Sequence, residues 1–368
     1  MREKVARHPY FSPMLSDLLV IETAGVLAGP AVGMFFAEEG ARVVKVENPR
    51  SGGDVTRQWK LPEEDPSASL SAYFSSVNHG KEHRFLDLKQ AHDRAEFDAL
   101  VAKADVLISN HLAKDARKLG LDRERLRALN PALVHGHISG YVNDPQRPAY
   151  DVVLQAETGY LSMTGTDREH LAKLPVAMID ILAAHQLKEG LLLALLHRAK
   201  GGKGAYVDVS LEEAALTGLV NQATNWLMAG HVAQPLGTLH PNIAPYGEVF
   251  RCADGGQIVL AVGSDAQFTK LCELVDLPGV SLDPRFTSNA DRVQHRKALA
   301  AELATAMAAS PRTELLASLQ KAGVPAGAVN TIDQALSSPA AQRMTVEEMI
   351  DGVRTVRIRG NAFRSEHF

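Results

Sequence analysis

A single carboxylate, Asp180, lies within the apolar segment that runs from Leu174 to Ala184. Removing an ionised carboxylate from water is costly unless hydrogen bonds or a nearby positive potential compensate. Such an aspartate can cap a helix that begins at Ile181 by accepting backbone amide hydrogens, or it can attack an electrophilic acyl carbon as a nucleophile. The two roles are compatible, because a helix N-terminus stabilises negative charge and would keep the carboxylate ionised.

Three glycines near the start of the chain, Gly25, Gly29 and Gly33, are spaced four residues apart. This spacing lines one face of a helix and predicts close packing of that helix on a sheet. It does not match Gly-x-Gly-x-x-Gly, so a nicotinamide-dependent dehydrogenase is disfavoured. The N-terminus of a helix that follows a strand is still a natural site for a phosphate.

Four cations, Arg57, Lys81, Arg117 and Lys118, follow successive predicted elements. Each lies in a segment that is by itself typical of a solvated surface loop, and Trp59, close to Arg57, is typical of a structural aromatic residue. Together these segments predict loops that converge on a polyphosphate ligand, because clustered Lys and Arg side chains bind phosphate oxygens.

Other common site chemistries lack their sequence patterns. The histidines form no helical His-x-x-x-His pair and no cluster with cysteine, so no metal site is expected. Neither a Gly-x-Ser-x-Gly elbow nor a Walker loop is present. The two cysteines, Cys252 and Cys272, form neither a metal spacing nor a disulfide framework, which favours a reducing compartment and makes the cytoplasm the expected location.

Composition excludes further classes of function. A net charge of −4 argues against nucleic-acid binding, which usually needs a basic face. The longest uncharged apolar stretch, residues 23–37, falls short of the roughly 20 residues that a membrane-spanning helix needs. Residues 1–9 carry charge without an apolar core, so no secretory leader is expected.

Apolar runs and helical patterns alternate along the first 230 residues. Residues 18–22 and 42–47 are predicted strands, joined by a helix with Pro30 at its first position and Gly40 at its end. Further helices are predicted at 90–103, 122–129, 181–198 and 211–229, with strands at 105–109, 133–139 and 206–210. This order predicts an α/β fold with a doubly wound, Rossmann-like parallel sheet.

The pattern changes near residue 230. Predicted strands at 246–252 and 257–262 flank Ala253-Asp-Gly-Gly256, a hairpin turn signal. A helix at 312–322, a short helix at 332–336 and a strand at 355–359 follow. We therefore expect a large α/β domain at 1–225, a smaller α+β domain at 226–330 and a C-terminal segment at 331–368.

Motifs that carry a family resemblance extend along almost the whole chain. They are Leu27-Ala-Gly-Pro30, Gly40 to Glu47, Gly53 to Trp59, Leu86 to Lys89, Asn130-Pro131, Ile138 to Tyr141, Tyr150 to Ala156, Gly202 to Asp208, His240-Pro241, Pro245-Tyr246, Asp283 to Phe286 and Ala322 to Gly327. In this order and spacing the chain resembles the family III CoA-transferases, which include formyl-CoA:oxalate and carnitine CoA-transferases and share their fold with α-methylacyl-CoA racemase.

The resemblance implies an enzyme that moves CoA from an acyl-CoA donor to a carboxylic acid. The family's nucleophilic aspartate corresponds to Asp180, and a tyrosine that lines the active site corresponds to Tyr150. The donor acyl group then forms an anhydride with the aspartate, CoA forms a thioester with the enzyme, and an acceptor carboxylate takes over the CoA. Coenzyme A is thus a substrate, and no tightly bound cofactor is implied. The residues placed against CoA are Val26, Leu27, Ala28, Arg50, Arg57, Trp59, Lys81, Asn110, Arg117 and Lys118.

The resemblance further implies an interlocked homodimer, two chains threaded like links. In that arrangement the C-terminal segment returns to the large domain, and the partner's small domain contributes to the active site. The expected partners are an acyl-CoA, a small carboxylic acid and a second copy of the chain, with no nucleic acid and no membrane.

Two alternatives stay open. An α-methylacyl-CoA racemase needs a histidine beside its aspartate, in a Gly-His-Asp context that here reads Ala149-Tyr150-Asp151, so transfer is preferred. Many family members have Asn-Phe-Arg-Pro-Gly where this chain has Asn110-His-Leu-Ala-Lys114, which keeps open a CoA-binding protein without turnover. Leu27 replaces the glutamine of the oxalate enzyme and disfavours oxalate as the acceptor.

Overall fold

The computed structural model describes residues 14–363, which divide into two compact units. Among these residues, the first unit comprises 14–160, Leu174–Val232 and 343–363, and the second comprises Leu161–Lys173 and Ala233–Gln342. These bounds differ from the ranges expected above, which stay predictions. Residues 1–9, on which the expectation of no secretory leader depends, lie outside the described residues.

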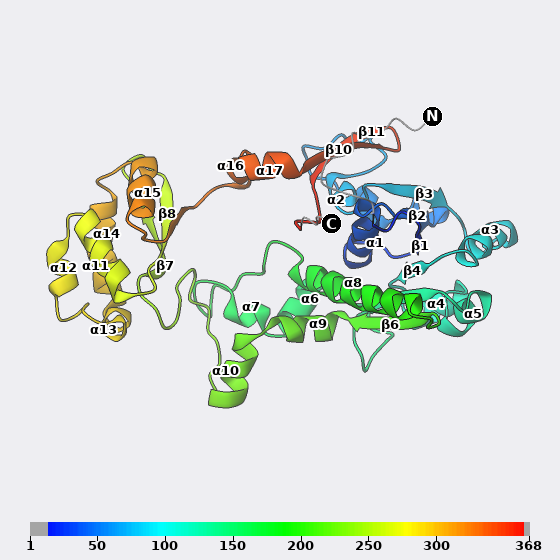
Figure 1. Cartoon of the computed structure of the whole chain (residues 1–368), viewed down its shortest axis with the longest axis horizontal. Coiled ribbons are helices and arrows are strands. Elements are labelled where there is room, and N and C mark those ends of the chain that lie inside the picture. Colours follow the sequence, from blue (N-terminus) through cyan, green and yellow to red (C-terminus); the bar gives the residue numbers. More distant parts are fainter. Residues whose placement is uncertain (1–13, 364–368) are drawn as a thin grey trace. The chain divides into compact units, whose positions relative to one another are not determined.

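The first unit is built on a six-stranded parallel sheet with the order β3-β2-β1-β4-β5-β6 (Figure 1). Its strands are β1 (Leu19–Glu22), β2 (Arg42–Glu47), β3 (Lys81–Phe85), β4 (Val106–Ser109), β5 (Val134–Ser139) and β6 (Ala205–Ser210). The order reverses between β1 and β4, as it does in doubly wound folds. The predicted α/β class with a parallel sheet is confirmed, although β3 was not predicted.

Helices cover both faces of this sheet. Ile21, Val44 and Leu107 form a buried core with Phe97 of α3 and Leu126 of α5, whereas α1 and α8 pack on β strands of the same sheet and on each other. The helices of this unit are α1 (Ala28–Glu38), α2 (Ala72–Ser75), α3 (Ala91–Val101), α4 (Ala113–Lys118), α5 (Arg123–Leu129), α6 (Asp151–Glu157), α8 (Met178–Ala199), α9 (Leu211–Gly218) and α10 (Asn221–Ala229), with 3-10 turns at Pro49–Ser51 and Val55–Gln58 and α7 (Tyr160–Met163) at the boundary of the units.

The glycines of α1 let the helix approach the sheet closely. A β-carbon on Gly29 would lie 2.3 Å from the β-carbon of Ala24, and one on Gly33 would lie 1.7 Å from the Glu22 carboxylate. Close packing, predicted from the spacing, is therefore confirmed for these two positions. The helix begins at Ala28, so Pro30 is its third residue and the expectation that it is the first was wrong.

Two other predictions differ from the structure. Residues 211–229 form two helices instead of one, because Val220 adopts a φ of +44°, which a continuing helix cannot contain. The segment that contains Arg117 and Lys118 forms the helix α4 and not the predicted loop. Both cations lie in its last turn, where they interact favourably with the helix dipole.

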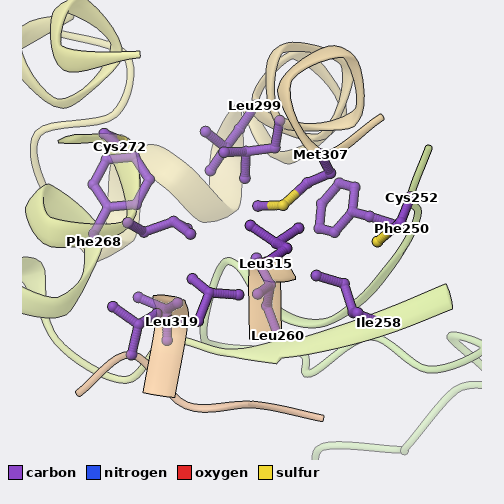
Figure 2. Packing of buried hydrophobic residues seen from close by; sticks show 14 of the residues in the cluster. Phe250, Cys252, Ile258, Leu260, Phe268, Cys272, Leu299, Met307, Leu315 and Leu319 are labelled. Atoms are coloured by element: carbon purple, nitrogen blue, oxygen red, sulfur yellow. The ribbon is translucent and has the colours of Figure 1, made fainter. Parts of the chain in front are cut away.

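The second unit has its own core and a small antiparallel sheet. Strands β7 (Tyr246–Arg251) and β8 (Gln257–Ala261) form the predicted hairpin, and β9 (Ala326–Ala328) pairs with β8. Figure 2 shows Phe250, Leu260, Phe268, Leu299 and Leu319 within the buried cluster between this sheet and its helices. Those helices are α11 (Asp265–Leu274), α12 (Pro278–Leu282), α13 (Asn289–Gln294), α14 (Arg296–Met307) and α15 (Arg312–Lys321), and α16 (Ile332–Leu336) and α17 (Pro339–Met344) follow.

A C-terminal hairpin, β10 (Thr345–Ile350) and β11 (Val353–Ile358), belongs to the first unit. Arg57 Nη1 donates to Asp351 at its turn over 2.8 Å, and Arg357 pairs with Glu38 of α1 over 2.6 Å. These buried cations attach the C-terminal hairpin to the turn at Val55–Gln58 and to α1. Among residues 14–363, no helix is long and apolar enough to cross a membrane.

Gly33→Ala tests the close approach of α1. The added methyl would displace the buried Glu22 carboxylate from its partners, and overpacking of this kind costs about 3 kcal/mol. Both tryptophans, Trp59 and Trp226, lie in the first unit, so tryptophan fluorescence in urea reports the stability of that unit. We expect a lower urea midpoint for Gly33→Ala and an unchanged one for Gly279→Ala, where an added β-carbon meets nothing within 4 Å.

Candidate active site

A cavity of about 560 Å³ lies at the carboxyl ends of the parallel strands, entirely within the first unit. Its walls include residues that follow each of the six strands, from the loop after β1 to Leu211 after β6. Ligands of doubly wound folds bind at this edge, beside the point where the strand order reverses. Asp180 and Tyr150 both line the cavity.

Asp180 is the third residue of α8, which begins at Met178 and has Ala177 at its N-cap. The expectation that Asp180 caps a helix beginning at Ile181 was therefore wrong. The residue is 9% exposed. Within residues 14–363, no hydrogen bond to its carboxylate is formed, so burial is not compensated in the way that buried carboxylates usually require.

The cap of α8 comes from another helix. Asp151, at the start of α6, accepts the amide hydrogen of Ile179 at 2.7 Å through Oδ1, and its Oδ2 accepts from the Gln155 side chain at 2.5 Å. Gln155 in turn accepts the Leu174 amide at 2.8 Å. The carboxylate of Asp151 thus caps the N-terminus of α8, and the carboxylate of Asp180 is left in the wall of the cavity.

Burial, and then the negative charge of Asp151, raises the pKa of Asp180 to about 7. Desolvation and a like charge thus oppose the helix N-terminus, which was expected to keep this carboxylate ionised. Near neutral pH the group exchanges between the acid and the carboxylate. A strongly shifted acid in a cavity is typical of a catalytic position.

Two tyrosines lie near this acid. Tyr150 precedes α6, lines the cavity and is 58% exposed. Burial, and then the charges of Asp180, Asp151 and Asp54, raises the pKa of Tyr73 to about 12, so its phenol stays a proton donor. Trp59 packs edge-on against Tyr73, with ring centroids 5.1 Å apart. Sequence analysis missed Tyr73, because only the short turn of α2 brings it near the carboxylates.

Five of the residues expected to contact CoA line the cavity: Val26, Leu27, Ala28, Arg50 and Asn110. Leu27 and Ala28 lie at the N-terminus of α1, where backbone amides lack intrahelical partners and favour an anion. Two further cations in the wall, Lys89 and Arg147, were not among the expected CoA contacts.

The other five do not line the cavity. Arg117 and Lys118 lie on α4, and Trp59 lies against Tyr73. Arg57 is bound by Glu47 at 2.7 Å, and Lys81 by Glu22 at 2.8 Å, so both cations are neutralised inside the fold. Their position after successive elements was a misleading signal, because the sequence does not show which carboxylate faces each cation. Within the described range, no three His, Cys, Asp or Glu side chains are placed to hold a metal ion.

The sequence profile of CoA-transferase family III matches residues 15–367. The chain belongs to this family. It is 37% identical to a succinate–glutarate CoA-transferase of Agrobacterium fabrum, over 94% of this chain and 90% of the relative. It is 35% identical to an acetyl-CoA:oxalate CoA-transferase of Acetobacter aceti, over 90% and 85% of the two chains.

Solved structures agree with this family assignment. A CaiB/BaiF family protein from Brucella suis superposes with a TM-score of 0.85 at 36% identity, covering 96% of this family III chain and 92% of its own. The resemblance stated from motifs is therefore confirmed at the level of family and of the α/β fold.

Asp180→Asn should stabilise the first unit at alkaline pH. The folded chain holds the proton of Asp180 up to about pH 7, whereas the ordinary pKa is 3.8, so wild-type stability falls as the pH rises through this window. A shift of this size corresponds to as much as roughly 4 kcal/mol. Asparagine cannot ionise and avoids the loss.

Urea midpoints from tryptophan fluorescence at pH 4.5 and pH 8 measure this effect. The variant should be more stable than the wild type by a much smaller margin at pH 4.5 than at pH 8. The exposed Asp144→Asn provides the control and should follow wild type throughout. Equal stability of Asp180→Asn and wild type at pH 8 would contradict the raised pKa.

Proposed function

We propose that this protein transfers CoA from an acyl-CoA to a carboxylic acid, with Asp180 as the covalent nucleophile. The observation that carries the proposal is the buried, cavity-lining carboxylate of Asp180 at the ligand-binding edge of the sheet. The names of the relatives, which are CoA-transferases acting on small carboxylic acids, support the reaction class.

The cavity is suited to the nucleotide part of an acyl-CoA. Its wall combines the N-terminus of α1 with three cations: Lys89, and the solvent-exposed Arg50 and Arg147, which pair with Asp87 and Glu157. Helix N-termini and Arg or Lys side chains are the groups that bind phosphates. In the proposal this wall holds CoA while its thioester reaches Asp180, and oxyanion charge is met by the backbone amides of Leu27 and Ala28 at the start of α1.

The proposed reaction has four steps, each of which forms or breaks a bond to the Asp180 carboxyl group. Asp180 attacks the donor thioester, which gives an acyl-aspartyl anhydride and releases CoA thiolate. The thiolate attacks the aspartyl carbonyl, which forms an enzyme thioester and frees the donor acid. The acceptor carboxylate attacks that thioester to give a second anhydride and CoA thiolate. The thiolate finally attacks the acceptor carbonyl, which yields the new acyl-CoA and restores Asp180.

A raised pKa suits this nucleophile. A carboxylate of higher basicity is a stronger nucleophile, provided that it is ionised at the working pH, and a pKa of about 7 meets both conditions near neutrality. Asp151 contributes to the shift and also fixes the start of α8, so it positions Asp180 in two ways.

Trapping of the enzyme intermediate tests the nucleophile. With an acyl-CoA present, borohydride or hydroxylamine should modify Asp180, and peptide mapping should locate the label there. Asp180→Asn should lose transfer by at least about 10³-fold and retain CoA binding, because only the covalent step is removed. The surface variant Asp144→Asn serves as the matched control and should label like wild type. A label on any other residue would overturn the assignment.

The same samples separate the alternatives. A racemase would incorporate solvent deuterium at the α-carbon of a 2-methylacyl-CoA without any acceptor acid. A CoA-binding protein without turnover would bind CoA in calorimetry and give no product with any pair of acyl-CoA and acid. Product that forms only when both are present supports transfer.

We also propose that the protein is a homodimer, interlocked as in its family, and acts in the cytoplasm, where its free cysteines Cys252 and Cys272 would persist as thiols. Large apolar side chains are exposed on α8 and α10, among them Leu193, Trp226, Leu227 and Met228. Apolar side chains that are exposed together on one helix, as Trp226, Leu227 and Met228 are on α10, are typical of a protein interface, and a second copy is the occupant that the family resemblance implies.

Light scattering during size-exclusion chromatography should give twice the chain mass of 39.7 kDa. Leu227 and Met228 are 79% and 83% exposed, so charging both with Leu227→Glu and Met228→Glu should reduce the dimer without harming the fold of one chain. Leu282→Glu, at an equally exposed leucine of the second unit, provides the control. A monomeric wild type would refute the proposal.

A further inference from the structure

Val26, between β1 and α1, has a backbone conformation that is rare for its type. Its φ is +70°, in the left-handed region, where a β-branched side chain is strained. The residue lines the cavity that also contains Asp180. Strained residues at a cavity persist only where the surroundings fix them, so the contacts that hold Val26 are informative.

Asp54 holds the amide of Val26. Both carboxylate oxygens accept its hydrogen, at 3.3 and 3.1 Å, and Oδ1 also accepts from the backbone and hydroxyl of Thr56 at 3.0 and 2.8 Å. The Asp54 side chain is almost fully buried. Four hydrogen bonds from Val26 and Thr56 therefore fix the Asp54 carboxylate beside the turn that contains Val26.

Lys45 fixes the same turn from the other side. Its ammonium group lies 3.1 Å from Asp54, and it donates to the Ala24 carbonyl at 2.8 Å and to Glu22 at 2.9 Å. The intervening peptide is held as well, because Asn110 donates to the Gly25 carbonyl at 2.9 Å and accepts its amide at 3.1 Å. Each residue from Ala24 to Val26 is thus attached through its backbone to a side chain of another loop or strand.

We infer that Asp54 is a positioning residue for CoA transfer: by holding Val26 in the left-handed region it presents the Leu27–Ala28 backbone to the cavity that Asp180 also lines. This inference depends on the proposed function for its consequence in catalysis. Donors fixed before the reaction stabilise developing charge more than donors that must reorganise. Released from Asp54, valine would return to an extended or helical φ and turn the following amides away.

Asp54→Ala should lower kcat about 50-fold, the effect of misplacing oxyanion donors, with KM for the acyl-CoA changed less than about threefold. Asp105→Ala is the matched control. Asp105 also accepts a β1 amide, that of Leu19 at 2.8 Å, and pairs with Arg198, but at the opposite end of the strand from the cavity. The Asp105→Ala variant should be less stable than wild type and should have an unchanged kcat. Asp54→Asn, which keeps one acceptor oxygen, should fall between wild type and Asp54→Ala and serves if the alanine variant does not fold.

A rescue separates positioning from a structural role. Glycine adopts positive φ without strain, so adding Val26→Gly to Asp54→Ala should recover kcat about tenfold although it restores no contact. The inference would be overturned if kcat fell in proportion to stability in both Asp54→Ala and Asp105→Ala. It would also be overturned if Val26→Gly did not restore kcat to Asp54→Ala.

Amide exchange of the Val26 peptide, followed by mass spectrometry, is independent of activity. Exchange should be faster in Asp54→Ala and unchanged in Asp105→Ala. If the wild type transfers no CoA, the proposed function fails, and amide exchange alone then tests the positioning of Val26. Unchanged exchange in Asp54→Ala refutes that positioning, and faster exchange supports it.

Discussion

The ion cluster of Glu22, Lys45 and Lys81 is the constraint on which the site depends. One buried carboxylate at the end of β1 binds the ammonium groups of both lysines, at 2.9 and 2.8 Å, and thereby joins the last residue of β1 to β2 and to the first residue of β3. Burial and the charge of Lys45 lower the pKa of Lys81 to about 8 despite Glu22, whereas the charges of Glu22 and Asp54 overcome burial and raise the pKa of Lys45. Such clusters define geometry more than they add stability, because removal of the charges from water offsets most of the attraction.

The cluster also determines how the chain enters its first helix. Gly33 allows α1 to lie against the Glu22 carboxylate, and Lys81 donates to the Pro30 carbonyl of that helix at 2.8 Å. Lys45 extends the same network to Asp54 and the strained turn at Val26. A charge at the end of one strand is therefore connected, contact by contact, to the backbone that lines the cavity.

The sequence revealed the parts of this arrangement that are local. Runs such as Val43-Val44 in β2, together with the helix end at Gly40, were sufficient to predict the parallel α/β unit, and Asp180 was found because a lone charge in an apolar segment is conspicuous. The ion-pair partners of a residue that lie far from it in the sequence could not be predicted. Arg57 and Lys81 looked like phosphate contacts because their carboxylate partners appear only in the folded chain: strand pairing brings Glu22 to Lys81, and the turn after β2 brings Glu47 to Arg57.

The capping of α8 shows the same limit and explains the chemistry of Asp180. An aspartate near a helix start is normally interpreted as its cap, but here Asp151, from α6, accepts the Ile179 amide. Asp180 is thereby relieved of a structural hydrogen bond that would lower its pKa, and the capping charge itself raises that pKa further. One contact thus produces two effects: it fixes the helix that carries the candidate nucleophile, and it makes the carboxylate of that nucleophile more basic. Both effects need only a second ordinary carboxylate, that of Asp151, in the capping position that Asp180 would usually take.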